Sequence, residues 1–135
     1  AQEESQSGIN FRVIRYADVL LMMAEVENEL SGPAAALPYI NLVRSRPDVA
    51  MPPYPTAQYP VGNQQQMLEA IMHERRVELA GEQIRNRDLR RWRRAGKLTS
   101  EPIPGYTDKN DLLPIPLQEI DNNNALTNSD QNPGY

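Results

Sequence analysis

The sequence predicts an all-α protein of two antiparallel helix hairpins, joined by a long irregular loop and followed by a tail rich in proline and asparagine. Three observations lead to this fold class. Apolar residues recur at helical spacing in four separate segments. Glycine and proline fall between these segments, where helices end and begin. The tail also carries many aspartates and asparagines, which favour turns.

The first hairpin is predicted from residues 12–45. In residues 12–30 the apolar residues recur every three or four positions, as in an amphipathic helix. These residues are Val13, Tyr16, Ala17, Leu20, Leu21 and Ala24. Residues 31–33, Ser-Gly-Pro, end this helix and start a second one at residues 34–45, because glycine favours the position after a helix and proline the first turn. Pro38 conflicts locally with the second helix, since proline removes a backbone hydrogen bond.

Residues 47–62 are predicted to form an extended loop. The segment holds five prolines, each of which biases the preceding residue away from helical conformation. Asn63 is the expected N-cap of a third helix, and Gln66 completes a capping box with it. This helix is expected to run to about Ala80, where Gly81 weakens or ends it.

A fourth helix is predicted at residues 83–95 and ends at Gly96. Residues 97–135 form the irregular tail, and we expect residues 112–135 to pack back on the hairpins. Two consecutive hairpins favour a stacked helical-repeat architecture. A chain of 135 residues suffices for one core, so residues 1–135 are predicted to form a single domain.

Composition excludes several classes of protein. The chain has no cysteine, which rules out disulfides, thiolate metal sites and a cysteine nucleophile. Its net charge of −4 lacks the basic excess of a nucleic-acid-binding domain. No apolar run is long enough to span a bilayer. The 39% of hydrophobic residues and the 12 prolines indicate either helices joined by long ordered loops or a piece of a larger protein.

No catalytic or metal-binding motif is complete. His73 opens a segment that begins like a zinc-protease helix, but the second histidine that this chemistry needs four residues later is Val77. The oxygen-rich segments 108–111, 121–124 and 128–130 lack the glycine and the distal glutamate of a calcium loop, so we expect them to form turns. The sequence therefore predicts no enzymatic activity, no metal and no cofactor.

Basic residues crowd the fourth predicted helix and the position after it. They are Arg85, Arg87, Arg90, Arg91, Arg93, Arg94 and Lys97. One interpretation is an electropositive patch for the phosphates of nucleic acid or lipid. The favoured interpretation is that the arginines pair with carboxylates of the third helix, because charges on buried faces are tolerated when they pair. We predict a partly buried charge network between these helices, with the members Arg75, Glu78, Glu82, Arg85 and Asp88.

Several segments, in order along nearly the whole chain, resemble the SusD/RagB family. Residues 10–22 resemble the start of that family's late helices, and residues 39–46 resemble the second helix of the hairpin. The most specific signature is residues 71–80, and residues 88–92 follow at the expected distance. Further matching segments are 112–116, 119–121 and 131–135. Between residues 80 and 88 the family's usual aromatic residues are absent, whereas its charged ones are kept.

The resemblance implies a surface lipoprotein of Bacteroidetes-type bacteria. Such a protein captures nutrient glycans at the outer membrane and covers a TonB-dependent, SusC-like transporter. Its late helices form a tetratricopeptide-like scaffold, and this chain would be that C-terminal portion. The lipidated cysteine and most residues that bind the oligosaccharide would lie outside the chain. No ligand-binding residue is carried over, because none of the matching motifs is a ligand motif.

A second interpretation is a freestanding helical-repeat adaptor that holds a peptide or partner protein in a groove. An upstream lipobox followed by several hundred residues would favour the first interpretation. Sugars stack on exposed aromatic residues, for which the candidates are Tyr54, Tyr59 and Trp92, with Trp92 expected in the core.

We also expect the isolated chain to self-associate through its first hairpin. Val13, Leu20 and Leu21 spread over more than one stripe and cannot all face the second helix. Exposed apolar area beyond a few hundred Å² usually drives association.

Overall fold

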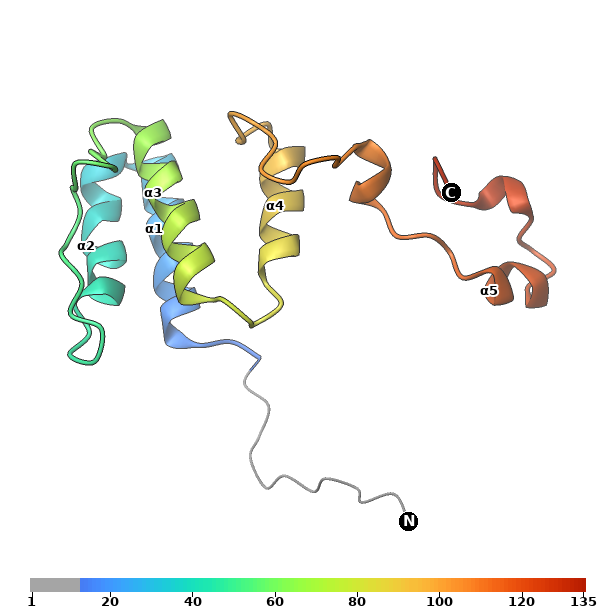
Figure 1. Cartoon of the computed structure of the whole chain (residues 1–135), viewed down its shortest axis with the longest axis horizontal. Helices are drawn as coiled ribbons and strands as arrows, with labels where there is room; N and C mark the ends of the chain where they lie inside the picture. Colours follow the sequence, from blue (N-terminus) through green and yellow to red (C-terminus); the bar gives the residue numbers. More distant parts are fainter. Residues whose placement is uncertain (1–12) are drawn as a thin grey trace, which may run out of the picture. The chain divides into compact units, whose positions relative to one another are not determined.

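The computed structural model describes residues 13–135 (Figure 1). All regular structure in these residues is helical and none of it is a strand, which confirms the all-α fold class. The chain divides into two compact units, of which the first ends at Arg85 and the second runs from Asn86 to Tyr135. Among the described helices, none has the length and apolar character needed to cross a membrane.

The first unit contains three helices: α1 (Tyr16–Leu30), α2 (Pro33–Arg44) and α3 (Gln64–Glu78). Each of them packs against the other two (Figure 1). The short turn between α1 and α2 makes these helices antiparallel, as predicted. Asn28, near the end of α1, donates a hydrogen bond to the carbonyl of Gln64 at the start of α3, at 2.9 Å. Helix α3 is therefore antiparallel to α1 and parallel to α2.

The turn into α2 has the predicted chemistry. Gly32 is the N-cap residue with a φ of 90°, a left-handed conformation that glycine adopts without strain, and Pro33 is the first helical residue. Pro38 lies inside α2 but is exposed, so water can bond the carbonyl group that loses its helical partner. Helix α1 begins at Tyr16, later than predicted, because Arg15 is extended. Arg12, the predicted start, lies outside the described residues.

The start of α3 confirms Asn63 as the N-cap. The side-chain oxygen of Asn63 accepts a hydrogen bond from the Gln66 amide at 2.9 Å. The side chain of Gln66 reaches back to the amide of Gly62 at 2.9 Å, one residue earlier than in a capping box. Two amides at the helix start are satisfied in this way.

The core of the first unit covers two rows of residues on α1. Leu20 is 8% exposed and Leu21 is fully buried, because α1 packs against both α2 and α3. Of the three residues from which we expected an open face, only Val13 is exposed, at 75%. Burying a side chain the size of leucine contributes about 1.5–3 kcal/mol. The remaining core residues include Ala24, Ala36, Ile40, Val43, Met67, Ala70 and Ile71.

The proline-rich loop contains neither helix nor strand and is fixed to the core through Tyr54. The Tyr54 amide donates to the side chain of Asn41 at 2.8 Å, and its carbonyl accepts from the same side chain at 2.9 Å. One side-chain amide thus satisfies both backbone groups of a buried loop residue. The loop carries the chain from the end of α2 to the start of α3.

The second unit is built from short helices: α4 (Arg85–Arg94), η1 (Asp108–Asp111), α5 (Leu117–Asn122) and η2 (Asn128–Asp130). Helix α4 starts two residues after the predicted position because Gln83 has a φ of 59°, which interrupts helical conformation. It ends at Arg94, and the predicted Gly96 follows with a φ of 65°, next to Lys97, whose amide donates to the carbonyl of Trp92 at 2.9 Å.

In the tail, side chains form hydrogen bonds with backbone groups of the same segment. The oxygen-rich segments 108–111 and 128–130 form single helical turns, closed at Thr107 and Thr127 by side chains three residues later. Gln131 makes two hydrogen bonds with the backbone of Ile115, at 2.7 and 2.8 Å. The hydroxyl of Tyr135 donates to the carbonyl of Leu112 at 3.1 Å. The end of the chain is thereby attached to residues 112–115.

Three predictions concern both units together and stay predictions. They are the single domain of residues 1–135, the second hairpin formed by α3 and α4, and the packing of residues 112–135 on the hairpins.

Candidate functional site

Two arginines from different helices meet one glutamate at the end of α3. Arg15 precedes α1, and Arg46 follows α2. The Nη1 atoms of Arg15 and Arg46 lie 2.9 and 2.7 Å from Oε1 of Glu78. Arg46 also donates from Nη2 to Oε2 of Glu78 at 3.0 Å, so this contact is bidentate. Glu78 therefore ties together three ends of helices.

Glu82 extends this group. Arg15 donates from Nε and Nη2 to the carboxylate of Glu82, at 2.9 and 2.7 Å. The hydrogen bond from Arg15 holds the pKa of Glu82 below its ordinary value. Chiefly the same bond raises the pKa of the Arg15 guanidinium. We call Arg15, Arg46, Glu78 and Glu82 the Arg15 cluster.

Two further ion pairs are buried between the helices of the first unit. Arg75 on α3 lies 2.8 Å from Asp18 on α1, and their side chains are 4% and 10% exposed. Arg44 on α2 lies 2.7 Å from Glu74 on α3, with side-chain exposures of 8% and 7%. The hydroxyl of Tyr54 donates to Glu74 at 3.2 Å. Such charges are tolerated in a core because each is bonded to an opposite charge.

Three of the five residues predicted to form a charge network take part in these contacts: Arg75, Glu78 and Glu82. In the first unit their partners are Asp18 on α1, Arg15 before it and Arg46 after α2. Sequence reasoning missed these partners because it paired the third helix only with its successor along the chain. The pairing of the set with Arg85 and Asp88 stays a prediction.

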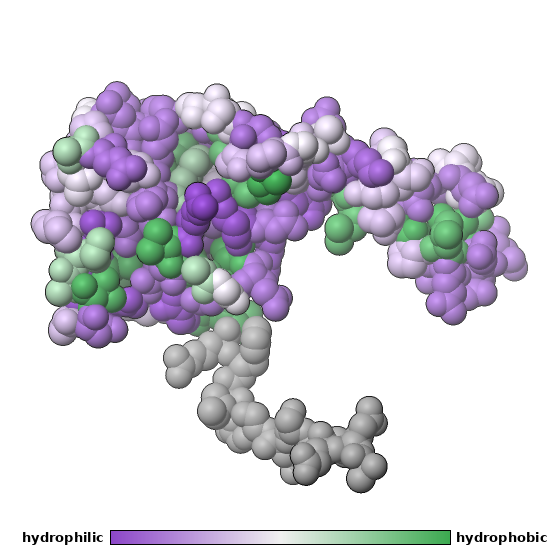
Figure 2. All heavy atoms as spheres, viewed as in Figure 1, coloured by the Kyte–Doolittle hydropathy of each residue, from purple (hydrophilic) through white to green (hydrophobic). Residues whose placement is uncertain are grey.

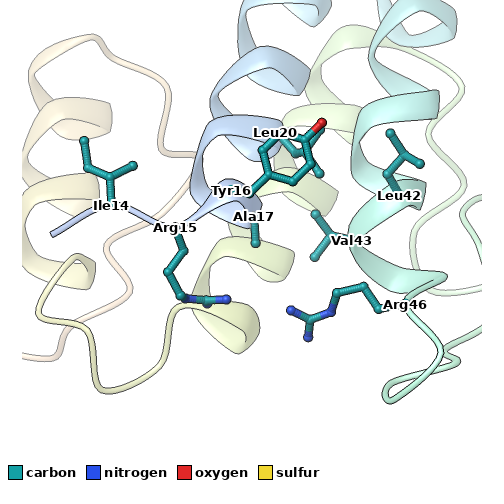
Figure 3. Close-up of a pocket in the computed structure, with 8 residues that line it drawn as sticks. All are labelled: Ile14, Arg15, Tyr16, Ala17, Leu20, Leu42, Val43 and Arg46. Atoms are coloured by element: carbon teal, nitrogen blue, oxygen red, sulfur yellow. The ribbon is translucent and has the colours of Figure 1, made fainter. Parts of the chain in front are cut away.

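A groove of about 470 Å³ opens between the start of α1 and the end of α2 (Figure 3). Its walls are mainly apolar, and Arg15 and Arg46 form one charged side. Tyr16 and Leu42 are 73% and 53% exposed. Since both arginines are bonded to Glu78, the groove offers mainly apolar contacts. The remaining lining residues are Ile14, Ala17, Leu20 and Val43.

An exposed row of apolar residues runs along α1, and we call it the apolar stripe of α1. Its members are spaced alternately by three and four positions, which is the spacing with which one helix packs against another. Figure 2 shows apolar atoms, in green, at the surface of the first unit among polar ones. The stripe consists of Tyr16, Val19, Met23, Val26 and Leu30, each at least 36% exposed.

The aromatic residues proposed as sugar platforms are mostly covered. Tyr54 is 3% and Trp92 is 1% exposed, so neither offers a free ring face, and Trp92 lies in the core as expected. Tyr59 is half-buried and stacks on His73 with ring centroids 4.8 Å apart. Tyr16, by contrast, is 73% exposed. Tyr16 has the spacing of the other apolar residues of the first helix, but it is the first residue of α1 and lies on the exposed stripe.

The structure gives His73 a packing role. Its ring is stacked on Tyr59 and half-buried. Within residues 13–135, no three side chains of histidine, cysteine, aspartate or glutamate are grouped so that they can hold a metal ion. The segments 108–111 and 128–130 use their side chains to close turns, as predicted.

In the second unit, Arg93 of α4 binds carboxylates of the tail. It donates from Nε to Glu101 at 2.9 Å, and its Nη1 lies 3.3 Å from Asp111. Its guanidinium lies 3.5 Å from the centre of the Tyr106 ring. Burial, and next the hydrogen bond that its hydroxyl donates to Asp111, raises the pKa of Tyr106. The expected pairing of some arginines of this helix with carboxylates of the third helix stays a prediction.

A comparison with protein families and curated proteins gives consistent matches. The model of the SusD family matches residues 1–111. The SusD-like protein P25 of Formosa agariphila is 42% identical over 131 residues, which cover 91% of this chain and 24% of that protein. The SusD-like protein P2 of the same bacterium is 34% identical, with coverages of 96% and 27%. The chain thus spans about a quarter of the length of these relatives.

Solved structures show the same helical arrangement. A SusD-like protein of Bacteroides fragilis superposes with a TM-score of 0.67 at 28% identity, over 91% of this chain and 25% of that one. A SusD superfamily protein of Bacteroides vulgatus superposes with a TM-score of 0.72 at 30% identity, over 96% and 28%. The fold of the chain is therefore also that of crystal structures with similar sequences.

Proposed function

Because the chain belongs to the SusD family, we propose that it takes part in binding nutrient glycans at a bacterial surface for uptake and catalyses no reaction itself. The family match over residues 1–111 is the observation that carries this proposal. The charges of the first unit support the absence of catalysis, since the Arg15 cluster and both buried pairs consist of charges paired with one another. Groups held in this way fix the geometry of helices and are poor acids or bases for a substrate.

We further propose that this chain is the C-terminal helical scaffold of a longer surface lipoprotein. The relatives that it matches are about four times as long. In this proposal the lipid anchor and most glycan-binding residues belong to the rest of the protein. A TonB-dependent, SusC-like outer-membrane transporter is the partner. Residues 1–135 form one domain, completed by the charge network of Arg75, Glu78 and Glu82 with Arg85 and Asp88.

Calorimetry with a panel of neutral oligosaccharides tests the scaffold role. The isolated chain is expected to bind them weakly or not at all, and the longer protein with its upstream residues to bind at least one with micromolar affinity. Arg15→Ala in the longer protein is expected to lower its melting temperature, yet to leave the sugar affinity of the folded protein unchanged. Micromolar affinity of the isolated chain, or a tenfold loss in Arg15→Ala, would place the glycan site within these helices.

The alternative function is that of a helical adaptor, and the apolar stripe of α1 favours it. Leu20 and Leu21 are buried, so the expectation of self-association now rests on this stripe. The isolated chain should associate in sedimentation experiments, because exposed apolar patches drive association. Val26→Lys should abolish association, whereas Val77→Lys on the exposed side of α3 should not. A parent chain that stays monomeric would contradict the role of the stripe.

A further inference from the structure

Four arginines lie on one face of α4, and we call them the arginine stripe. Six of the ten residues of α4 are arginine, and none is lysine. Arg87, Arg90, Arg91 and Arg94 follow the spacing i, i+3, i+4 and i+7, which places them in one row. Asp88, Leu89 and Trp92 of the same helix are buried instead. The four arginines line a hollow of about 480 Å³ together with Ala95.

Few negative groups neutralise this stripe. Arg91 donates to Asp88 at 3.0 Å. Arg90 donates to the backbone carbonyl of Asp111, since the carboxylate of that residue lies against Arg93. Within the second unit, no carboxylate lies within ion-pair distance of Arg87, Arg90 or Arg94. Like charges at these spacings destabilise a helix, and a bound anion would remove this cost.

We propose that the arginine stripe binds an acidic polysaccharide, a carbohydrate chain that carries sulfate or carboxylate groups. The planar fork of each guanidinium fits such groups with two hydrogen bonds. From Arg87 to Arg94 the stripe extends over two helical turns, about 10 Å, so it suits a chain with repeated charges better than a single small ion. This inference rests on the proposed glycan-binding function and adds the class of glycan.

Other polyanions fit the stripe less well. Single-stranded nucleic acid needs exposed aromatic rings for its bases, whereas Trp92, the aromatic residue of α4, is 1% exposed. A membrane-surface helix needs apolar residues beside its basic ones, and the hollow is lined by arginines and one alanine.

The test is calorimetric titration of the chain with dextran sulfate, polygalacturonate, neutral dextran and a single-stranded DNA oligonucleotide. Dextran sulfate, polygalacturonate or both should bind, and binding should weaken between about 50 and 200 mM salt. The double variant Arg87→Gln/Arg94→Gln should lose about tenfold in affinity, since two charge-assisted contacts are removed. Arg76→Gln, which changes an exposed arginine on α3, is the control and should bind like the parent.

Each result decides the inference. Binding of only one acidic polymer identifies sulfate or carboxylate as the recognised group. Equal affinity for neutral dextran, equal losses in Arg76→Gln and the double variant, tighter binding of DNA, or no binding of either acidic polymer overturns the inference. The proposed glycan-binding function fails separately, if the longer protein binds no oligosaccharide at all.

Discussion

Different interactions stabilise each of the two units of the molecule. The first unit buries a continuous apolar core and two ion pairs between three helices. In the second unit the buried apolar residues are Leu89, Trp92 and Ile120, and polar side chains bond the backbone of the tail. The first unit should therefore respond to changes in volume, which affect the whole fold, and the second to loss of single hydrogen bonds, which affect one segment.

The largest effect is expected from the core of the first unit. Ile71 is fully buried, so Ile71→Ala should lower the free energy of unfolding by about 2–5 kcal/mol through lost burial and a cavity. Val77 on the same helix is 59% exposed, and Val77→Ala should change the free energy of unfolding by at most about 0.5 kcal/mol. Urea denaturation followed by circular dichroism measures both. Similar losses in the two variants would mean that the first unit has no specific core.

Breaking a buried ion pair should have an effect of similar size. Arg75→Ala leaves Asp18 buried without its partner and should cost about 3–5 kcal/mol, and Glu78→Ala should cost somewhat less. Thermal unfolding of both variants measures this, with exposed Arg76→Ala as the control. If Arg75→Ala and Glu78→Ala melt within a degree or two of the parent, the charges are solvated and the network is wrong.

The Arg15 cluster should make the first unit sensitive to acid. Since the folded pKa of Glu82 is lowered from 4.5, its contribution to stability is present above that value and is lost as the pH falls through the folded pKa. Glu82→Gln should therefore melt at a lower temperature than the parent at neutral pH, and the difference should shrink as the pH falls below 4.5. Glu69→Gln is the control. A difference that is constant with pH would contradict the role of Glu82.

The smallest effect is expected in the second unit. Gln131→Ala removes two hydrogen bonds to Ile115, each contributing about 0.5–1.5 kcal/mol. The amide of Ile115 should then exchange faster with solvent, while the melting temperature of the whole chain stays the same. Exchange measured by NMR tests this, with exposed Gln118→Ala as the control. A general loss of protection would show that the tail contributes to global stability.

Local chemistry explains what the sequence predicted well. Helix starts and stops depend on residues that are close in the chain, so the residue types alone predict where they lie. Examples are the turn at Gly32 and Pro33, the cap at Asn63 and the stop of α4 before Gly96. The turns of the tail are likewise closed by side chains three residues away.

Long-range contacts explain what the sequence did not predict. Arg15 forms hydrogen bonds with Glu78 and Glu82, which lie more than sixty residues away in the chain, and no sequence pattern in α1 predicts these contacts. Tyr16 has the helical spacing of a core residue but lies on the exposed stripe, whereas Leu20 and Leu21 are both buried because α1 has two neighbours. Periodicity identifies apolar residues of a helix, and the number of packed neighbours decides which of them are covered.

The parallel course of α2 and α3 has an electrostatic consequence. Both helices finish at the same end of the first unit, so the partial negative charges of two carbonyl ends add there to the carboxylates of Glu78 and Glu82. Arg44 and Arg46, at the end of α2 and just beyond it, supply cations at this point, and Arg15 adds a third. These arginines compensate two helix dipoles as well as the side chains. An acidic ligand could bind these arginines only by separating them from the two helix ends, which would leave both dipoles uncompensated. This end of the bundle should therefore repel anions.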